Sequence, residues 1–150
     1  MKTTSKENIR SHCAVNYGME VFGDRWSLLI IRDIVFGGKK TYGEFLKSEE
    51  GIATNVLASR LAFLEEQGIL SRAPSPDDRR KDFYTLTEKG LDLIPIVLSI
   101  VLWSAKHDSK SYVRGLKAFI TRLSQSPTQV TEEVKALVRN GGCMFPEINE

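Results

Sequence analysis

A predicted helix between Ile52 and Gln67 carries side chains that could read the edges of base pairs. Its apolar residues recur at spacings of four and three and share one face: Leu57, Leu61 and Leu64. A rotation of about 100° per residue places another set on the opposite face: Asn55, Ser59 and Ala62. Such small or hydrogen-bonding side chains fit a DNA major groove, whereas a merely solvated face usually carries Lys and Glu. We therefore predict base contacts from Asn55 and Ser59, with Thr54 near the helix start.

A predicted β-hairpin next to this helix ends in a run of cations. One strand begins at Ile69, turn residues follow from Pro74, and Asp82 to Leu86 returns as the second strand. The hairpin tip holds Arg79, Arg80 and Lys81. Long flexible cations suit phosphates or a narrow minor groove. The pattern therefore indicates a helix presented beside a basic loop; a pair of helices and a hairpin that only build a core is the alternative.

A second predicted helix must position the first one, and it begins at Thr41. The Thr41 hydroxyl can cap free backbone N–H groups while Glu44 reaches back to the cap, and Gly51 ends the helix. Two lysines precede the cap, where a helix N-terminus favours anions, so we expect phosphate contacts there from Lys39, Lys40 and Thr41. Arg60 lies at the border of the apolar face, where a salt bridge to a neighbouring helix and contact with the DNA backbone are equally open.

Several segments together resemble the HxlR-type winged-helix regulators. They are Cys13-Ala-Val, Gly23-Asp-Arg-Trp-Ser-Leu-Leu-Ile, Tyr42-Gly-Glu-Phe-Leu, Gly51-Ile-Ala-Thr-Asn-Val-Leu, Arg60-Leu-Ala-Phe-Leu-Glu, Gly68-Ile-Leu-Ser-Arg and Tyr84-Thr-Leu-Thr-Glu-Lys-Gly. The likeness covers Cys13 to Asp108, and the cysteine ahead of the Gly-x-[Lys/Arg]-Trp motif separates this family from the MarR and ArsR winged helices. Asp24-Arg25 replaces the family's usual Gly-Lys, and the hairpin tip is more charged than is usual.

The resemblance implies a mainly α (α+β) fold: a winged helix-turn-helix with a two-stranded β-wing, additional C-terminal helices and a homodimeric assembly. It implies a sequence-specific transcriptional regulator that binds double-stranded DNA and responds to a small-molecule or redox effector. We expect a DNA-binding and dimerisation domain over residues 1–108 and a helical extension over 109–150 that ends in a mobile tail. The resemblance does not account for this extension.

The run from Leu91 to Trp103 is apolar on nearly all sides, which calls for burial on more than one side. A second subunit would supply the other side, and two-fold pairing would present two reading helices to an inverted repeat. The alternative is a layer within one chain, with Val113 to Val138 wrapped around this helix. We expect Pro95 to kink the helix and the helix from Ser11 to Phe22 to pack against the dimer seam. The predicted interface residues are Val15, Met19, Leu91, Ile94, Leu98, Val101 and Leu102.

Cys13 could act as a sensor, because a helix N-terminus lowers a thiol pKa and positive charge on Arg10 and His12 would lower it further. A thiolate there would react with electrophiles or oxidants. The matching family cysteine senses in some regulators and not in others, and a small apolar thiol that only fills space is the alternative. Cys143 is expected to be incidental.

Composition sets limits on the remaining classes of protein. A formal net charge of +2 over 150 residues is too small to argue for nucleic acid, so that argument rests on local placement. Two distant cysteines and no apolar leader indicate a cytoplasmic protein, and the apolar run from Leu91 is short for a bilayer. No metal, cofactor or catalytic constellation is recognisable, so we expect no enzyme. A winged-helix protein-interaction module without specific DNA binding is the rival reading.

Overall fold

The computed structural model describes residues 9–111 and 116–146. It is mainly helical with one antiparallel two-stranded sheet, which confirms the expected fold class. The elements in chain order are α1 (Ala14–Phe22), α2 (Ser27–Gly37), α3 (Tyr42–Leu46), α4 (Thr54–Glu66), β1 (Leu70–Pro74), β2 (Asp82–Leu86), α5 (Glu88–Leu91), α6 (Ile94–His107), α7 (Leu116–Gln125) and α8 (Pro127–Arg139).

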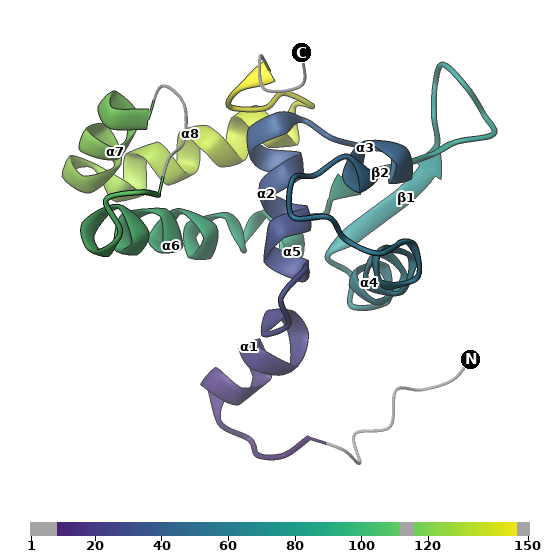
Figure 1. The fold of residues 1–150 in the computed structure, drawn as a ribbon, viewed down its shortest axis with the longest axis horizontal. Helices are drawn as coiled ribbons and strands as arrows, with labels where there is room; N and C mark the ends of the chain where they lie inside the picture. The colour runs from purple at the N-terminus through teal and green to yellow at the C-terminus, as the bar shows by residue number, and fades with distance from the viewer. Residues whose placement is uncertain (1–8, 112–115, 147–150) are drawn as a thin grey trace.

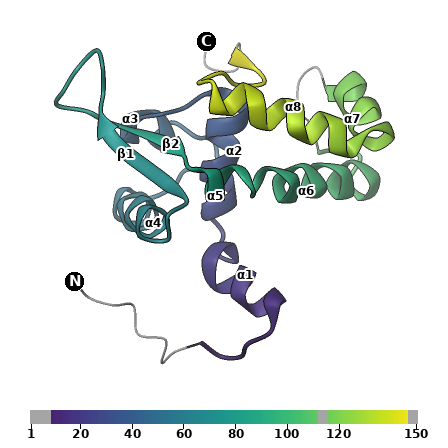
Figure 2. The ribbon, with the colours of Figure 1, turned by 180° about the vertical axis from the view of Figure 1, so that it is seen from behind.

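Helix α2 lies at the centre of the molecule (Figure 1). Its Ile31 and Val35 are fully buried in the core. Helix α4 and the hairpin formed by β1 and β2 lie on one side of α2, and α6, α7 and α8 lie on the other; the view from behind shows the same division (Figure 2). Helix α1 projects away from both groups. The side with α4 and the hairpin is therefore left uncovered by the C-terminal helices.

The helix-turn-helix formed by α3 and α4 follows the local signals in the sequence. Thr41 Oγ1 accepts a hydrogen bond from the Glu44 backbone N–H at 3.3 Å, and Glu44 accepts one from the Thr41 N–H at 2.8 Å, so the expected capping box is confirmed. Helix α3 ends at Leu46, earlier than the expected end at Gly51, which instead adopts a φ of 69° in the connection to α4. The expected apolar face of α4 is buried to 1% exposure or less: Leu57, Leu61 and Leu64.

The hairpin formed by β1 and β2, here called the wing, pairs from Leu70 opposite Leu86 to Pro74 opposite Asp82. Its loop is ordered by Ser75, which is 4% exposed and accepts hydrogen bonds from the backbone N–H groups of Asp77 and Asp78. The Tyr84 N–H donates to the Lys40 carbonyl at 2.8 Å, which ties the wing to the segment that leads into α3. The wing is thus tied to the rest of the chain at the middle of β2, and its loop is ordered by local hydrogen bonds.

The apolar run after the wing differs from the sequence prediction. It forms two helices instead of one kinked helix, because α5 ends at Leu91 and Pro95 lies in the first turn of α6, where its missing N–H costs nothing. Three residues assigned to the dimer seam are buried inside the single chain at 2% exposure or less: Leu91, Ile94 and Leu98. That part of the interface prediction is wrong, because α2, α7 and α8 already pack against α6, and α8 and β2 pack against α5, which carries Leu91. The alternative of a helical layer within one chain is the observed one.

The stretch Glu88–His107, taken as one helix of 20 residues, contains an 18-residue window with a mean hydropathy of 1.3 and is long and apolar enough to cross a membrane by length and composition alone. The same test is passed by core helices of soluble proteins. Here the buried side chains of α5 and α6 belong to the hydrophobic core.

The C-terminal extension packs against the rest of the chain and its end is docked. Leu123 and Val130 are 1% exposed, and Arg139 forms a two-fold hydrogen-bonded ion pair with Glu88 at 2.8 and 3.0 Å. After α8, the backbone N–H groups of Met144 and Phe145 donate to the carbonyls of residues 35 and 36 at the end of α2. Residues 141–146 are therefore held in place, contrary to the expected mobile tail, while 147–150 lie outside the described residues.

Candidate nucleic-acid interface

The outer face of α4 has the composition that was expected from the sequence. Thr54, Asn55 and Ser59 are all exposed; Asn55 and Ser59 lie opposite the buried leucines, and Thr54 is the first residue of the helix. The Tyr42 hydroxyl donates to the Thr54 carbonyl at 2.9 Å, so α3 holds the first turn of α4 directly. Asn55 and Ser59 therefore share one solvent-facing strip, and the neighbouring helix holds the first turn of α4, where Thr54 lies.

Arg60 lies beside this strip and links α4 to α2. Its guanidinium is 3.6 Å from Asp24 Oδ1 and lies 4.8 Å from the centre of the Phe63 ring. Asp24 also accepts hydrogen bonds from the Trp26 and Ser27 N–H groups at the start of α2. Burial alone would raise the Asp24 pKa, but a hydrogen bond from the Ser27 hydroxyl, these two backbone hydrogen bonds and the Arg60 charge outweigh it, and the pKa is lowered. Of the two alternatives for Arg60, the structure contains the salt bridge.

The two lysines before α3 have different surroundings. Lys39 points inward: its ammonium lies 3.3 Å from Asp33 Oδ2 and donates to Ser48 Oγ at 2.8 Å, and its side chain is 14% exposed. The Lys40 ammonium donates to the Gly141 carbonyl at 3.3 Å. The Lys40 ammonium also lies 5.7 Å from the centre of the Phe83 ring. Phosphate contact by Lys39 would therefore require the loss of an internal ion pair, whereas Lys40 would give up no ion pair with a carboxylate among those found.

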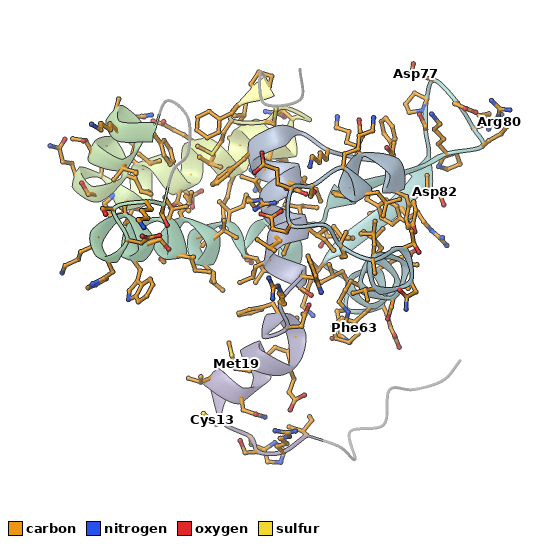
Figure 3. The ribbon with its side chains drawn as sticks, in the orientation of Figure 1. Cys13, Met19, Phe63, Asp77, Arg80 and Asp82 are labelled. Carbon is orange, nitrogen blue, oxygen red and sulfur yellow. The ribbon has the colours of Figure 1, made fainter. Side chains whose placement is uncertain are left out.

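The wing tip brings together the three predicted cations and nearby carboxylates. Figure 3 shows Arg80 at the far end of the loop, with Asp77 and Asp82 on the same hairpin. The Arg80 side chain is 90% exposed and its Nε lies 3.0 Å from Asp78 Oδ1, while Arg79 and Lys81 are also exposed. The hydrogen bond from Arg80 lowers the pKa of Asp78. The acid next to the basic run thus orients one of its cations, a role not anticipated from the sequence.

A cleft of about 550 Å³ separates α4 from the wing. It is lined by Tyr42, Ala58, Leu61, Ala62, Glu65, Glu66, Arg72 and Tyr84. Within it, the Arg72 guanidinium lies 3.4 Å from Glu65 Oε2 and 3.6 Å from Asp82 Oδ2. The charge of Glu65, followed by that of Asp82, raises the pKa of Arg72. Sequence reasoning did not single out Arg72, because its partners come from α4 and the opposite strand.

Cys13 lies at the N-cap position of α1, and its free thiol is exposed. Hydrogen bonds from the backbone N–H groups of Asn16 and Val15 lower its pKa. The direction agrees with the expected influence of a helix N-terminus, although Arg10 and His12 do not contribute to it. Cys143 is half-buried in the docked tail, which lies at the opposite end of α2 from α1 (Figure 1).

Large apolar side chains are exposed on α1 and α6. Val15 is 72% and Met19 51% exposed, as a dimer surface would require of them, and Figure 3 shows Met19 on the projecting helix. On α6, Trp103 is 66% and Ile100 46% exposed, and neither was assigned to the interface from the sequence. Val101 and Leu102 are half-buried. Burial on the inner face of α6 therefore leaves its outer face, not the predicted one, as the free apolar surface.

A helix-turn-helix followed by an ordered, cation-tipped hairpin on the same side of the molecule defines a winged helix-turn-helix protein. Across residues 9–111 and 116–146, no group of three or more His, Cys, Asp or Glu side chains is arranged to hold a metal ion.

The chain belongs to the HxlR-like helix-turn-helix family, whose model matches residues 21–112. An uncharacterised HTH-type transcriptional regulator of Mycobacterium tuberculosis is 34% identical over 94 residues, covering 63% of this chain and 58% of the relative. The matched part thus spans little more than half the length of that relative.

Two solved structures share the fold. The crystal structure of PA1607, described as a candidate transcription factor, is 38% identical with a TM-score of 0.63, covering 70% of this chain and 74% of that one. The redox regulator HypR in its oxidised form is 28% identical with a TM-score of 0.57, covering 65% of this chain and 99% of that one. The first is thus described as a candidate transcription factor and the second as a redox regulator.

Proposed function

We propose that this protein is a sequence-specific, DNA-binding transcriptional regulator that acts in the cytoplasm as a homodimer on an inverted-repeat operator. The observation that carries the proposal is that α4, with its polar, low-charge face, and the cation-tipped wing lie on the same side of α2, which the C-terminal helices leave uncovered. Membership of the HxlR-like family and the description of its relatives as HTH-type transcriptional regulators support it.

The roles of the residues follow from their positions. Exposed hydrogen-bonding side chains on α4 contact base edges: Thr54, Asn55 and Ser59. Cations and a helix start contact phosphates or the minor groove: Lys40, Thr41, Arg79, Arg80 and Lys81. Arg60 braces α4 through Asp24 and reaches DNA only if that salt bridge opens. Lys39 was predicted among the phosphate ligands, and its internal ion pair counts against that role.

In the proposed dimer, the two subunits meet through the free apolar surface. This surface consists of Val15 and Met19 on α1 with Ile100 and Trp103 on α6. A surface with so many exposed large apolar side chains is typical of an interaction site. Two-fold pairing there would present two copies of α4 to successive major grooves, about one helical turn apart.

The effector of this proposal acts through Cys13. Its thiol is exposed and has a lowered pKa, both of which favour reaction with oxidants or electrophiles. The similarity to HypR, a redox regulator, supports this assignment. Cys13 lies on α1, next to the proposed dimer surface, so a modification there would disturb the pairing that spaces the two reading helices.

The proposal is tested by measuring duplex binding against salt concentration with purified protein. A binding site is first selected from a random duplex pool, and binding to it is compared with binding to a random duplex. We expect tight, strongly salt-dependent binding with a clear preference for the selected duplex, because phosphate contacts release counterions. If no duplex is enriched and no salt-dependent binding exceeds background, the winged-helix protein-interaction module is the better account.

A further inference from the structure

A cluster of four charged side chains and one serine joins α2 to the connection between α3 and α4. Its members are Arg32, Asp33, Lys39, Ser48 and Glu50. We propose that this cluster, here called the clamp, sets the position of α4 for DNA reading, and that Arg32 and Glu50 are its positioning residues. The proposal rests on the DNA-binding function proposed above.

Asp33 is the centre of the clamp. It is 7% exposed, although it lies on α2 among the apolar residues of the core. Its Oδ1 accepts hydrogen bonds from Arg32 Nε at 3.0 Å and Nη2 at 2.7 Å. Its Oδ2 lies 3.3 Å from the Lys39 ammonium and accepts a hydrogen bond from the Ser48 hydroxyl. A buried carboxylate is tolerated only when it is paired in this way, so each partner is held in place by the need to satisfy it.

Arg32 extends the clamp to the connection itself. It donates to both carboxylate oxygens of Glu50, with Nη2 2.9 Å from Oε2. This two-fold pairing is the strongest geometry for an arginine and a carboxylate. The hydrogen bond from Arg32 lowers the Glu50 pKa to about 2. One guanidinium therefore binds a buried acid on α2 and an acid in the turn at the same time.

The clamp acts at the point that determines where α4 begins. The connection bends at Gly51, where φ is 69°, and α4 starts at Thr54, shortly after Glu50. Ile52, which is 8% exposed, anchors the connection to the core. Because burial of an apolar side chain is not directional, this contact alone does not fix the orientation of the connection. Ser48 and Glu50 both lie just before the bend, and their hydrogen bonds to Asp33 and Arg32 add a directional restraint there. A small displacement there would move the base-reading residues along the groove.

The clamp also assigns Lys39 a different role from that of a phosphate ligand. Two cations and two carboxylates make the cluster neutral, and Lys39 supplies one of those cations. Removal of the Lys39 side chain would leave Asp33 without one of its partners. A contact between Lys39 and a DNA phosphate would have the same effect. Lys39 is therefore an internal member of the clamp, and Lys40 remains available to the duplex.

The test compares Glu50→Gln with Glu49→Gln, using the duplex selected by the wild-type protein and a random duplex. Glu49 is an exposed neighbour in the same turn for which no ion pair is found among the described residues. Loss of a negative charge near DNA should tighten binding slightly in both variants. The clamp predicts the opposite sign for Glu50→Gln: affinity for the selected duplex falls about tenfold while random-duplex binding is kept.

Two further variants separate positioning from folding and from phosphate contact. Arg32→Lys keeps the charge but not the two-sided hydrogen bonding, and we expect it to lower the preference for the selected duplex as Glu50→Gln does. Lys39→Met should lower that preference without changing the salt slope, whereas a phosphate ligand would flatten the slope by about one unit.

Several outcomes would overturn the proposal. Equal or tighter selected-duplex binding by Glu50→Gln, matching Glu49→Gln, would show that the ion pair does not position α4. Parallel losses on both duplexes would indicate fewer folded molecules and not a misplaced helix. A flattened salt slope in Lys39→Met would return that lysine to the DNA backbone.

Discussion

Replacing Leu98 by Ala distinguishes an internal core residue from a dimer contact. Leu98 is 1% exposed within one chain, beneath a cleft that Leu102 and Leu123 also line. A Leu→Ala change at such a site costs about 2–5 kcal/mol through lost burial and a residual cavity. For a chain of this length each kcal/mol lowers Tm by about 2–4 °C, so a loss of about 3 kcal/mol predicts a fall of roughly 6–12 °C.

The matched control is Trp103→Ala on the exposed face of the same helix. Trp103 is 66% exposed, so its removal should change monomer stability by no more than about 0.5 kcal/mol. If it belongs to the dimer surface, its loss should raise the dimer dissociation constant by about tenfold or more, because buried tryptophans dominate interfaces. Thermal unfolding and sedimentation equilibrium measure the two effects separately.

The two variants should therefore behave in opposite ways. Leu98→Ala should lower Tm with little change in dimer dissociation, and Trp103→Ala should do the reverse. A stable but monomeric Leu98→Ala protein would refute the reasoning, because it would place Leu98 at the seam between subunits and not in the core of one chain.

Four other changes have defined outcomes. Thr41→Ala removes the cap of α3 and should cost about 1 kcal/mol in urea unfolding; an unchanged midpoint would mean that the box contributes nothing. Arg80→Ala should weaken binding to all duplexes and lower the salt slope by about one unit, and an unchanged slope would exclude contact by the wing tip. Because the Glu50 pKa is lowered from 4.5 to about 2, its stabilisation is present above about pH 4.5 and is lost as pH falls towards 2; unfolding against pH should show a shallower acid loss in Glu50→Gln. Diamide should reduce DNA affinity of the wild type but not of Cys13→Ser, and identical behaviour would leave Cys13 without a sensing role.

The helix-turn-helix and the wing were predictable because their signals are local. The capping box at Thr41, the leucine spacing of α4 and the turn residues before Asp82 each act within a few residues. The predicted second strand coincides with β2, and α4 differs from its predicted range only at the ends. Local signals therefore specify both elements and the side of the helix that faces solvent.

The surroundings of α6 could not be predicted in the same way. A helix that is apolar on nearly all sides requires cover, but the sequence does not say whether a second subunit or a later part of the same chain provides it. Here α7 and α8 cover Leu98, and what remains exposed is Trp103. The sequence thus correctly predicted that this helix needs apolar cover, but it was wrong about which part of the protein provides that cover.

The clamp was missed for a related reason. Asp33, with Arg32 beside it, lies in an otherwise apolar segment. Ser48, which binds Asp33, and Glu50, which binds Arg32, lie far along the chain. A lone acid in a run of core residues was the available signal, since a buried charge requires partners. Identifying those partners needs the fold.

The central claim is that the exposed face of α4 reads base edges, and Asn55→Ala tests it most directly. The measurement is the affinity of wild type and variant for the selected duplex and for a random duplex at one salt concentration. We expect a loss of about 1–3 kcal/mol on the selected duplex and almost none on the random one, because base contacts carry the specificity. Equal losses on both duplexes, or none on either, would contradict the assignment of this face to DNA reading.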